Sequence, residues 1–436
     1  MSKHPLQKII AAQKQGIPVG IYSACTANEL VIEAVMERAL RDQDDVLIEA
    51  TSNQVNQYGG YTGMKPADFR DFAFAIAAKV HFPKEKIILG GDHLGPLTWK
   101  HLTADKALAE ARELVKQFVL AGFTKIHIDT SMHLADDDKK RKLETEVIAE
   151  RGALLCEAAE QAYTELRASR PDAVQPVYVV GSEVPIPGGS EEAEEGIQVT
   201  KVSDFEETVR MFQAAFARRN LQSAWEAVIA VVVQPGVEFG DETIHEYNRA
   251  AAKDLTQALK KYPNLVFEGH STDYQTPQAF EQMVADGIAI LKVGPALTFA
   301  LREGLFALNQ IENELFQDAP EIKRSDFIKV LEAAMVQNPE NWQKHYHGSA
   351  DSIRLARKYS FSDRCRYYLP VPEVKAAIDV LLRNLKSVQI PLTLISQYLP
   401  VQYTKIRAGL LRNNPESLAK DRVVNCLDEY LYGVKP

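Results

Sequence analysis

Polar and ionisable side chains stand where short apolar runs of this sequence end. The run "KIILGGDH" ends on the adjacent Asp92 and His93, and the run "LVFEGHS" ends close to His270. Two imidazoles and a carboxylate that converge on one cavity form a nitrogen and oxygen site for a metal ion. The predicted ligands are His93, His270 and Glu183, with Gln234 or Asp129 nearby.

A single histidine at a strand end has a simpler interpretation, as a hydrogen-bonded residue of the core. His93 alone would favour that interpretation, whereas His270 and Glu183 at equivalent strand ends favour a metal site. Asp92, next to a predicted ligand, is then a candidate general acid/base whose pKa the cation would influence. Asp129 has an alternative role, in which it binds backbone amides of the next turn. The candidate catalytic residues are Asp92, Glu183 and Asp129.

These side chains need a scaffold that gathers strand ends, and the sequence predicts one. Eight nearly continuous apolar runs, typical of parallel strands buried on both faces, alternate with amphipathic helical patterns. Eight such units over about 300 residues match the (β/α)₈ TIM barrel, in which active sites lie at the carboxyl ends of the strands. An open doubly wound sheet is the alternative, but no Rossmann glycine fingerprint is present. The runs span Pro18 to Cys25, Asp45 to Thr51, Lys86 to His93, Lys125 to Ser131, Pro176 to Glu183, Val228 to Gly236, Leu265 to Ser271 and Ile288 to Pro295.

Glycine-containing strand ends could bind an anion through backbone N–H groups. The segments "GHSTDYQ" and "KVGPALT" follow the seventh and eighth runs, where such barrels commonly bind phosphate. Ordinary βα turns are the alternative. Lys292 could also form a Schiff base with a ketose, but a phosphate contact is the simpler prediction. The phosphate candidates are Ser271, Thr272, Lys292 and Gly294.

The last part of the chain has a different character. From about Asp318 onward the strand-like runs stop, and helical patterns with aromatic and basic residues follow, as in "YSFSDRCRYYLP". We predict a barrel over residues 1–317 and a helical extension over residues 318–436 that packs on the barrel over its mouth. A separate interaction domain is the alternative.

Composition excludes several classes of protein. The 436 residues carry a formal net charge of −9, which argues against a nucleic-acid surface. The four cysteines form no CxxC pair, which fits reduced thiols in the cytoplasm, where we expect the protein to be located. No run approaches the ~20 apolar residues that cross a bilayer, and no signal peptide is recognisable, so no membrane association is expected.

Seven motifs together resemble the Z-type subunit family of class II D-tagatose-1,6-bisphosphate aldolase, from about Ile21 to the C-terminus. The resemblance implies a barrel of the class II aldolase type. Some members have been labelled tagatose-6-phosphate kinases, but this chain has no Walker A loop for ATP. Stand-alone members are assigned as 4-epimerases of tagatose and fructose or their 6-phosphates. The motifs are "LIEATSNQVNQYGGYTGMKPADFR", "ILGGDHLGP", "GSEVPIPGG", "VVQPGVEF", "EGHSTDYQTP", "ILKVGPALTFALRE" and "ISQYLP".

The family is similar to the catalytic class II aldolases, which implies roles for individual residues. Their Asp-His pair, in which Asp moves a proton and His binds zinc, is matched by Asp92 and His93. Their later ligand histidine is matched by His270, their acidic residue on strand five by Glu183, and the Asp of their "ID" motif by Asp129. Where they have a further zinc-binding histidine on the sixth strand, this chain has Gln234. This departure weakens the site for zinc and argues against ordinary aldolase activity. Zinc is still the favoured divalent ion, with Mn, Co or Ni as alternatives.

The first functional hypothesis is a metal-dependent ketose 4-epimerase in carbohydrate metabolism that interconverts D-tagatose (6-phosphate) and D-fructose (6-phosphate). Retro-aldol cleavage of C3–C4 is preferred over transient oxidation at C4, because no nicotinamide fingerprint is visible. The metal would polarise the C2 carbonyl, and Asp92 would shuttle the proton of the C4 hydroxyl. Asn53 and Gln54 are candidate contacts for sugar hydroxyls.

Two other hypotheses remain open. The chain could be a non-catalytic accessory subunit that supports a separate aldolase catalytic subunit, or an aldolase in its own right. The expected partners are a small-molecule ketose or ketose phosphate, an aldolase catalytic subunit and further copies of the chain in a homo-oligomer.

Overall fold

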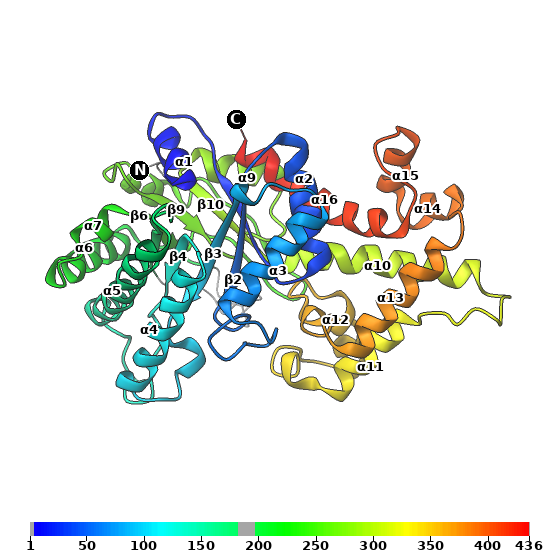
Figure 1. Ribbon diagram of the computed structural model, residues 1–436, viewed down its shortest axis with the longest axis horizontal. Helices are drawn as coiled ribbons and strands as arrows, with labels where there is room; N and C mark the ends of the chain where they lie inside the picture. Colours follow the sequence, from blue (N-terminus) through cyan, green and yellow to red (C-terminus); the bar gives the residue numbers. More distant parts are fainter. Residues whose placement is uncertain (1–3, 182–196, 436) are drawn as a thin grey trace.

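Eight parallel strands close into a barrel in the computed structural model, which describes residues 4–181 and 197–435 (Figure 1). Around the barrel the strand order is β1-β10-β9-β6-β5-β4-β3-β2, which confirms the predicted TIM barrel. A short hairpin of β7 (Glu238–Phe239) and β8 (Ile244–His245) follows the sixth barrel strand. The barrel strands are β1 (Ile21–Cys25), β2 (Val46–Thr51), β3 (Ile87–Leu94), β4 (Lys125–Ile128), β5 (Val177–Val180), β6 (Val228–Val233), β9 (Val266–Gly269) and β10 (Ile288–Val293).

Helices cover the outside of the barrel because each presents an apolar stripe to the strands. α4 shows how the sequence sets a helix boundary: its apolar repeat ends at Leu120, and Gly122 follows with φ +92°, a conformation that favours glycine. None of the described helices is long and apolar enough to cross a membrane. The covering helices are α2 (Glu29–Asp42), α3 (Pro66–Lys79), α4 (Ala104–Leu120), α5 (Thr145–Ser169), α6 (Val202–Arg218), α7 (Gln222–Glu226), α8 (Lys253–Leu259), α9 (Pro277–Ala285) and α10 (Pro295–Leu315).

The amino end of the barrel is closed by apolar packing. α1 (Pro5–Lys14) inserts Leu6 and Ile10 among inward-facing strand residues such as Leu47 and Ile290. Among the described residues, this layer is an apolar cluster, with His4 paired to Thr124 at its edge (3.0 Å). Ionisable side chains inside the barrel therefore belong to its central layer and its carboxyl end.

The C-terminal region is helical, as predicted, and its last helix returns to the barrel. α16 contacts α2, α9 and α10, and the amide of Gly20 donates to the Val434 carbonyl at 2.9 Å. The boundary at residue 317 stays a prediction, because α16 contributes to the layer of helices around the barrel (Figure 1). The helices are α11 (Phe327–Gln337), α12 (Ala350–Tyr359), α13 (Pro372–Lys386), α14 (Leu392–Tyr398), α15 (Pro400–Arg407) and α16 (Pro415–Val434).

Residues 359–367, called here the rim segment, attach the C-terminal region to loops at the carboxyl end of the barrel. The Tyr274 hydroxyl, after β9, donates to the Phe361 carbonyl at 2.6 Å, and the Thr298 hydroxyl, at the start of α10, donates to Asp363 Oδ2 at 2.6 Å. The Ser360 hydroxyl donates to Asp241 Oδ1 at 2.7 Å. These bonds hold the rim segment against the barrel mouth.

Close packing of α10 on α16 depends on a glycine and yields a first prediction. A Cβ at Gly304 would lie 3.0 Å from Cα of Ala419, closer than side chains normally pack. We expect Gly304→Val to lower the free energy of unfolding by about 1–3 kcal/mol, as overpacking does. Urea denaturation would measure the loss, with Glu314→Val, on an exposed position of the same helix, as the control. A loss no larger than that of the control would contradict the packing argument.

Candidate metal centre

Three histidines and an aspartate meet at the carboxyl end of the barrel. Asp92 and His93 come from β3, His127 from β4, and His270 directly follows β9. One potential ligand atom from each residue lies within 4.8 Å of the others, and all four residues are buried. The structure therefore brings together Asp92, His93 and His270, and it adds His127 to the predicted set.

Each imidazole has one ring nitrogen paired with an oxygen atom outside this group. The pairs are His93 Nδ1 with Asp129 Oδ2 (2.9 Å), His270 Nε2 with Glu268 Oε1 (2.9 Å) and His127 Nε2 with the Gly181 carbonyl (3.4 Å). Histidines that bind a metal through one nitrogen usually donate from the other to a carboxylate or carbonyl, which fixes the ring. Three histidines and a carboxylate are a donor set that fits a divalent ion of the zinc type. Nδ1 of His127 accepts the His93 amide at 3.1 Å and lies 2.9 Å from Asp92 Oδ1, so an ion bound to His127 would replace these contacts.

The glycines of "GGDHLG" make room for the site. A Cβ at Gly90 would collide with the Glu49 carboxylate, and a Cβ at Gly95 would collide with the Asp129 carbonyl. His93 itself has φ +48°, a left-handed conformation that is costly for a residue with a side chain. The surrounding contacts must compensate for this strain, and strain of this kind is typical of functional sites.

A buried lysine lies beneath the histidines. Nζ of Lys125 is 2.7 Å from Oε1 of Glu49 and 2.7 Å from Oε2 of Glu268, and all three side chains are 0% exposed. Burial alone would raise the pKa of Glu268, but Lys125 and then His270 lower it to about 2. Glu268 therefore stays ionised and can orient His270.

Lys292 links this lysine-carboxylate group to Asp92. Its Nζ forms an ion pair with Glu49 and lies 3.1 Å from Asp92 Oδ2. Burial lowers the pKa of Lys292 to about 8. The amine thus points into the barrel beside Asp92, away from the loop amides with which the phosphate prediction grouped it.

The ionisation of Asp92 is set by its neighbours. Burial favours the neutral acid, but the charge of His93 and the contact with His127 hold the pKa of Asp92 well below its usual value. His93 in turn has a pKa raised to about 9, because Asp92 and Asp129 outweigh its burial. Asp92 is consequently available as a carboxylate at neutral pH.

The other predicted metal-site residues take different positions. Asp129 pairs with His93 Nδ1 at 2.9 Å and also accepts the Ser131 amide at 3.1 Å, which is the alternative role considered for it. Its catalytic role stays a prediction. Oε1 of Gln234 accepts the amides of Gly236 (2.8 Å) and Val237 (2.9 Å), which ties this side chain to its own turn. Glu183 lies outside the described residues.

The four phosphate candidates are largely engaged with other groups. The Thr272 hydroxyl donates to the Lys292 carbonyl at 2.6 Å. The Gly294 amide donates to Asp273 Oδ1 at 3.1 Å, so a carboxylate already occupies this turn. Ser271 is half-buried with φ +51° and lines the cavity described below.

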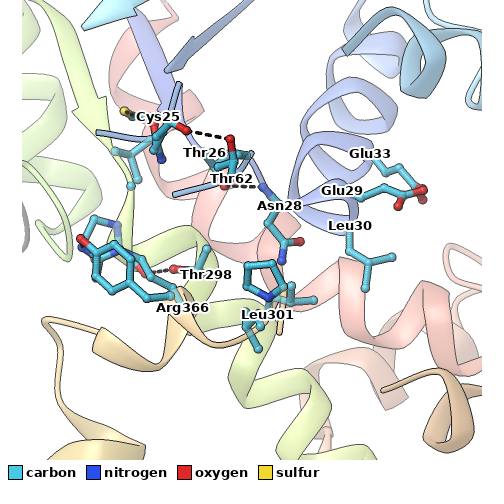
Figure 2. A pocket seen from close by; sticks show the side chains of 18 of the residues that line it. Cys25, Thr26, Asn28, Glu29, Leu30, Glu33, Thr62, Thr298, Leu301 and Arg366 are labelled. Carbon is cyan, nitrogen blue, oxygen red and sulfur yellow. Dashed lines mark hydrogen bonds between the residues drawn. The ribbon is translucent and has the colours of Figure 1, made fainter. Parts of the chain in front are cut away.

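A cavity of about 880 Å³ opens above the histidines and is lined by both the barrel and the C-terminal region. Asn53 and Gln54, the predicted sugar contacts, line it after β2, and Arg366 of the rim segment lines it from the other part of the chain. Figure 2 shows Arg366 and Thr298 among the lining side chains, with Glu29 of α2 on the other side of the view. A cavity of this size has room for a small organic ligand in addition to a metal ion.

His127 was absent from the sequence prediction although its signal is present. In "KIHIDTS", Lys125, His127 and Asp129 alternate with apolar residues, and side chains two apart in a strand share a face. All three face the barrel interior or its mouth. The prediction rests on residues at the strand ends, and His127 lies one step below the rim of the barrel, facing inward.

The chain is similar over nearly its whole length to proteins of one family. Residues 6–435 match the family described as "D-tagatose-1,6-bisphosphate aldolase subunit GatZ/KbaZ-like". The chain is 47% identical over 431 residues to the D-tagatose-1,6-bisphosphate aldolase subunit GatZ of Salmonella dublin, covering 99% of each chain. The corresponding subunit of Escherichia coli O1:K1 is 49% identical over 428 residues, covering 98% of this chain and 99% of that one.

A solved structure agrees along most of the length. The crystal structure of a probable tagatose 6 phosphate kinase from Sinorhizobium meliloti 1021 is 48% identical, with a TM-score of 0.86, and covers 95% of this chain and 100% of that chain. Together with the family match, this confirms the predicted resemblance.

The metal ligands can be tested individually. We expect His127→Ala to weaken Zn²⁺ or Co²⁺ binding at least about 10-fold, as His93→Ala and His270→Ala should, because each removes a nitrogen donor. Gln234→Ala should bind as wild type does, since its oxygen is held by backbone amides. Competition with a chromophoric chelator would measure affinity, with exposed His101→Ala as the control. Full affinity in His127→Ala, with a loss in Gln234→Ala, would reverse the assignment.

The buried lysine gives a stability prediction. Lys125→Met should lower the free energy of unfolding by about 3–5 kcal/mol, because Glu49 and Glu268 would be left buried without their shared cation. Lys116→Met removes an exposed ion pair with Glu165 and should change stability by no more than about 1 kcal/mol. Chemical denaturation would compare the two, and equal effects would show that the buried bridge contributes no more than a surface pair.

Proposed function

The chain belongs to the GatZ/KbaZ-like family of D-tagatose-1,6-bisphosphate aldolase subunits, and from this premise we propose that it acts as a subunit of such an aldolase, beside a separate catalytic chain. The observation that carries the proposal is similarity over nearly the whole length to relatives named as this subunit. The barrel, the rim segment and the returning α16 all lie within the matched residues.

A second function is favoured by the geometry of the metal centre. The buried group of Asp92, His93, His127 and His270 would support metal-dependent chemistry on a ketose, with 4-epimerisation of a six-carbon ketose or its 6-phosphate as the preferred reaction. When bound, a divalent ion supplies Lewis-acid polarisation of a carbonyl group. Zinc suits three imidazoles and a carboxylate best. An aldolase in its own right would use the same bond cleavage but would release both fragments.

The residues of the chain supply the remaining steps. Asp92 would take the proton of the C4 hydroxyl while the C3–C4 bond breaks, so that C4 becomes an aldehyde and the bonding electrons pass to the C2 carbonyl. After rotation of the aldehyde, C3 would attack its other face, which re-forms the C3–C4 bond with C4 inverted, and Asp92 would return the proton to the C4 oxygen. Lys292, 3.1 Å from Asp92, would hold the carboxylate in position.

The rim residues would orient the sugar. Oε1 of Gln54 accepts the Thr51 amide at 2.8 Å, and the side chain also hydrogen-bonds to Tyr61, which fixes it at the cavity. The remaining N–H of its NH₂ group would bind a sugar hydroxyl. Asn53 is exposed at the cavity edge, where Thr98 donates to its Oδ1 at 3.2 Å. Both side chains would hold the ketose in a fixed orientation while the bond between C3 and C4 breaks and re-forms.

One variant separates the two functions. A subunit that acts by association should raise the rate or lifetime of a D-tagatose-1,6-bisphosphate aldolase catalytic chain several-fold, and Asp92→Asn should retain this effect. A ketose epimerase should convert D-fructose 6-phosphate or D-fructose without a partner, and Asp92→Asn should lose about 10²-fold in turnover. Asp105→Asn, exposed on α4, is the matched control for both assays.

The outcomes do not overlap. Failure to stimulate or bind the catalytic chain would contradict the subunit proposal, whatever the epimerase assay gives. If the chain still stimulates the aldolase but shows no turnover with any divalent ion tried, the epimerase function is excluded. Release of both fragments by the chain alone would instead identify an aldolase.

A further inference from the structure

Arg366 reaches the cavity from the C-terminal region and is held without a carboxylate partner. Its Nη1 donates to the carbonyls of Ser362 and Asp363, the latter at 3.0 Å, and its Nη2 donates to the Tyr367 hydroxyl at 3.0 Å. The guanidinium also lies over the Tyr367 ring, 4.4 Å from its centroid. In the part of the chain that the structure describes, no carboxylate is close enough to form an ion pair with it, although the charges of Asp363 and Asp273 interact with it from further away.

An unpaired arginine in a half-buried position is unusual, because charged side chains away from bulk water are normally paired. Nearby Arg302 follows the rule, with Nε 3.4 Å from Asp363 Oδ1. Arginine carries five N–H donors, and the described bonds of Arg366 involve only its two terminal nitrogens. The side chain therefore keeps both charge and donor capacity for a ligand in the cavity.

The position of Arg366 is fixed in advance. Two hydrogen bonds, from Tyr274 to Phe361 and from Thr298 to Asp363, anchor the rim segment to the segments that follow β9 and β10. On the cavity side, the ring of Tyr367 packs edge-on against Tyr61, with centroids 5.2 Å apart. A preorganised cation binds an anion without the entropic cost of ordering a long side chain.

The loops that usually bind phosphate in such barrels are filled from within the chain. Asp273 Oδ1 accepts the amides of Gly294 (3.1 Å) and Ala296 (2.8 Å), at the start of α10. Burial raises the pKa of Asp273 to about 6, although these amides and Arg366 oppose the shift. With Lys292 committed to Glu49 and Asp92, a phosphate group on a ligand needs a different cation.

We propose that Arg366 is the anchor for the terminal phosphate of a ketose phosphate, with C2 to C4 of the sugar directed toward the metal centre. The inference rests on the proposed ketose-phosphate function and names the residue that would select the phosphorylated substrate. A guanidinium binds phosphate through paired N–H donors, a geometry that an ammonium group cannot reproduce. The C-terminal region would thus supply one end of the substrate site, and the barrel strands the other.

Calorimetric titration of the full-length chain with D-fructose 6-phosphate, D-fructose and inorganic phosphate tests the assignment. Arg366→Gln should weaken binding of D-fructose 6-phosphate and of phosphate at least about 10-fold, the loss typical of a charge-assisted hydrogen bond, and should leave D-fructose within about 2-fold. Arg366→Lys should recover part of the loss, because charge returns without the paired donors. Arg407→Gln is the matched control, since Arg407 also donates to a tyrosine hydroxyl, at 2.9 Å, but on the exposed surface of α15.

Each result has one interpretation. Unchanged binding of D-fructose 6-phosphate, or equal weakening of both sugars as expected from a loosened rim segment, would overturn the role of Arg366. Phosphate binding that depends on Arg366 in a chain without epimerase turnover would support the anchor and refute the epimerase. If Arg366→Gln leaves turnover of both the phosphorylated and the free ketose unchanged, Arg366 does not bind the phosphate, whereas the epimerase function is supported.

Discussion

The bridge of Lys125 between Glu49 and Glu268 is the interaction on which the rest of the site depends. These residues come from β4, β2 and β9, none of which are neighbours in the barrel, so the bridge crosses its interior. Burying three charges is expensive, and an apolar layer of equal volume could be as stable. The bridge does what an apolar layer cannot: Glu268 orients His270 and Glu49 holds Lys292 beside Asp92. Its role is therefore better explained by positioning than by stability.

The barrel could be predicted because its signal is local and repeated. Each strand is a short apolar run, each run is followed by a helical pattern, and eight repetitions leave few architectures. The residues at the strand ends, including Asp92, His93 and His270, followed from the rule that such ends share one mouth. The inward-facing charges Glu49, Lys125 and Glu268 did not, because which interior positions lie at the same height depends on the stagger of the strands around the closed barrel. For His127 the alternation in "KIHIDTS" indicates the inward face but not the height in the barrel.

The specific contacts of the rim segment also could not be predicted from the sequence. Its aromatic and basic composition in "YSFSDRCRYYLP" was visible, but periodicity carries no information about where a loop docks. Docking depends on particular pairs distant in sequence, such as Thr298 with Asp363 and Tyr274 with Phe361. The predicted phosphate site depends on a contact of the same kind, between residues distant in sequence. The turn before α10 has the composition of an anion site, and only the structure places Asp273 on its amides.

A site whose two ends come from different parts of the chain couples ligand binding to the attachment of the C-terminal region. Any ligand that contacts both the metal centre and Arg366 binds only while the rim segment is docked, so by mass action it stabilises the docked state. The same linkage applies in reverse to a protein partner: one that binds the C-terminal region and favours its docked position must strengthen ligand binding, and one that displaces it must weaken it. A subunit function and a ketose site are therefore compatible in this chain. An association that acted through the rim segment would require no contact between the partner and the metal centre.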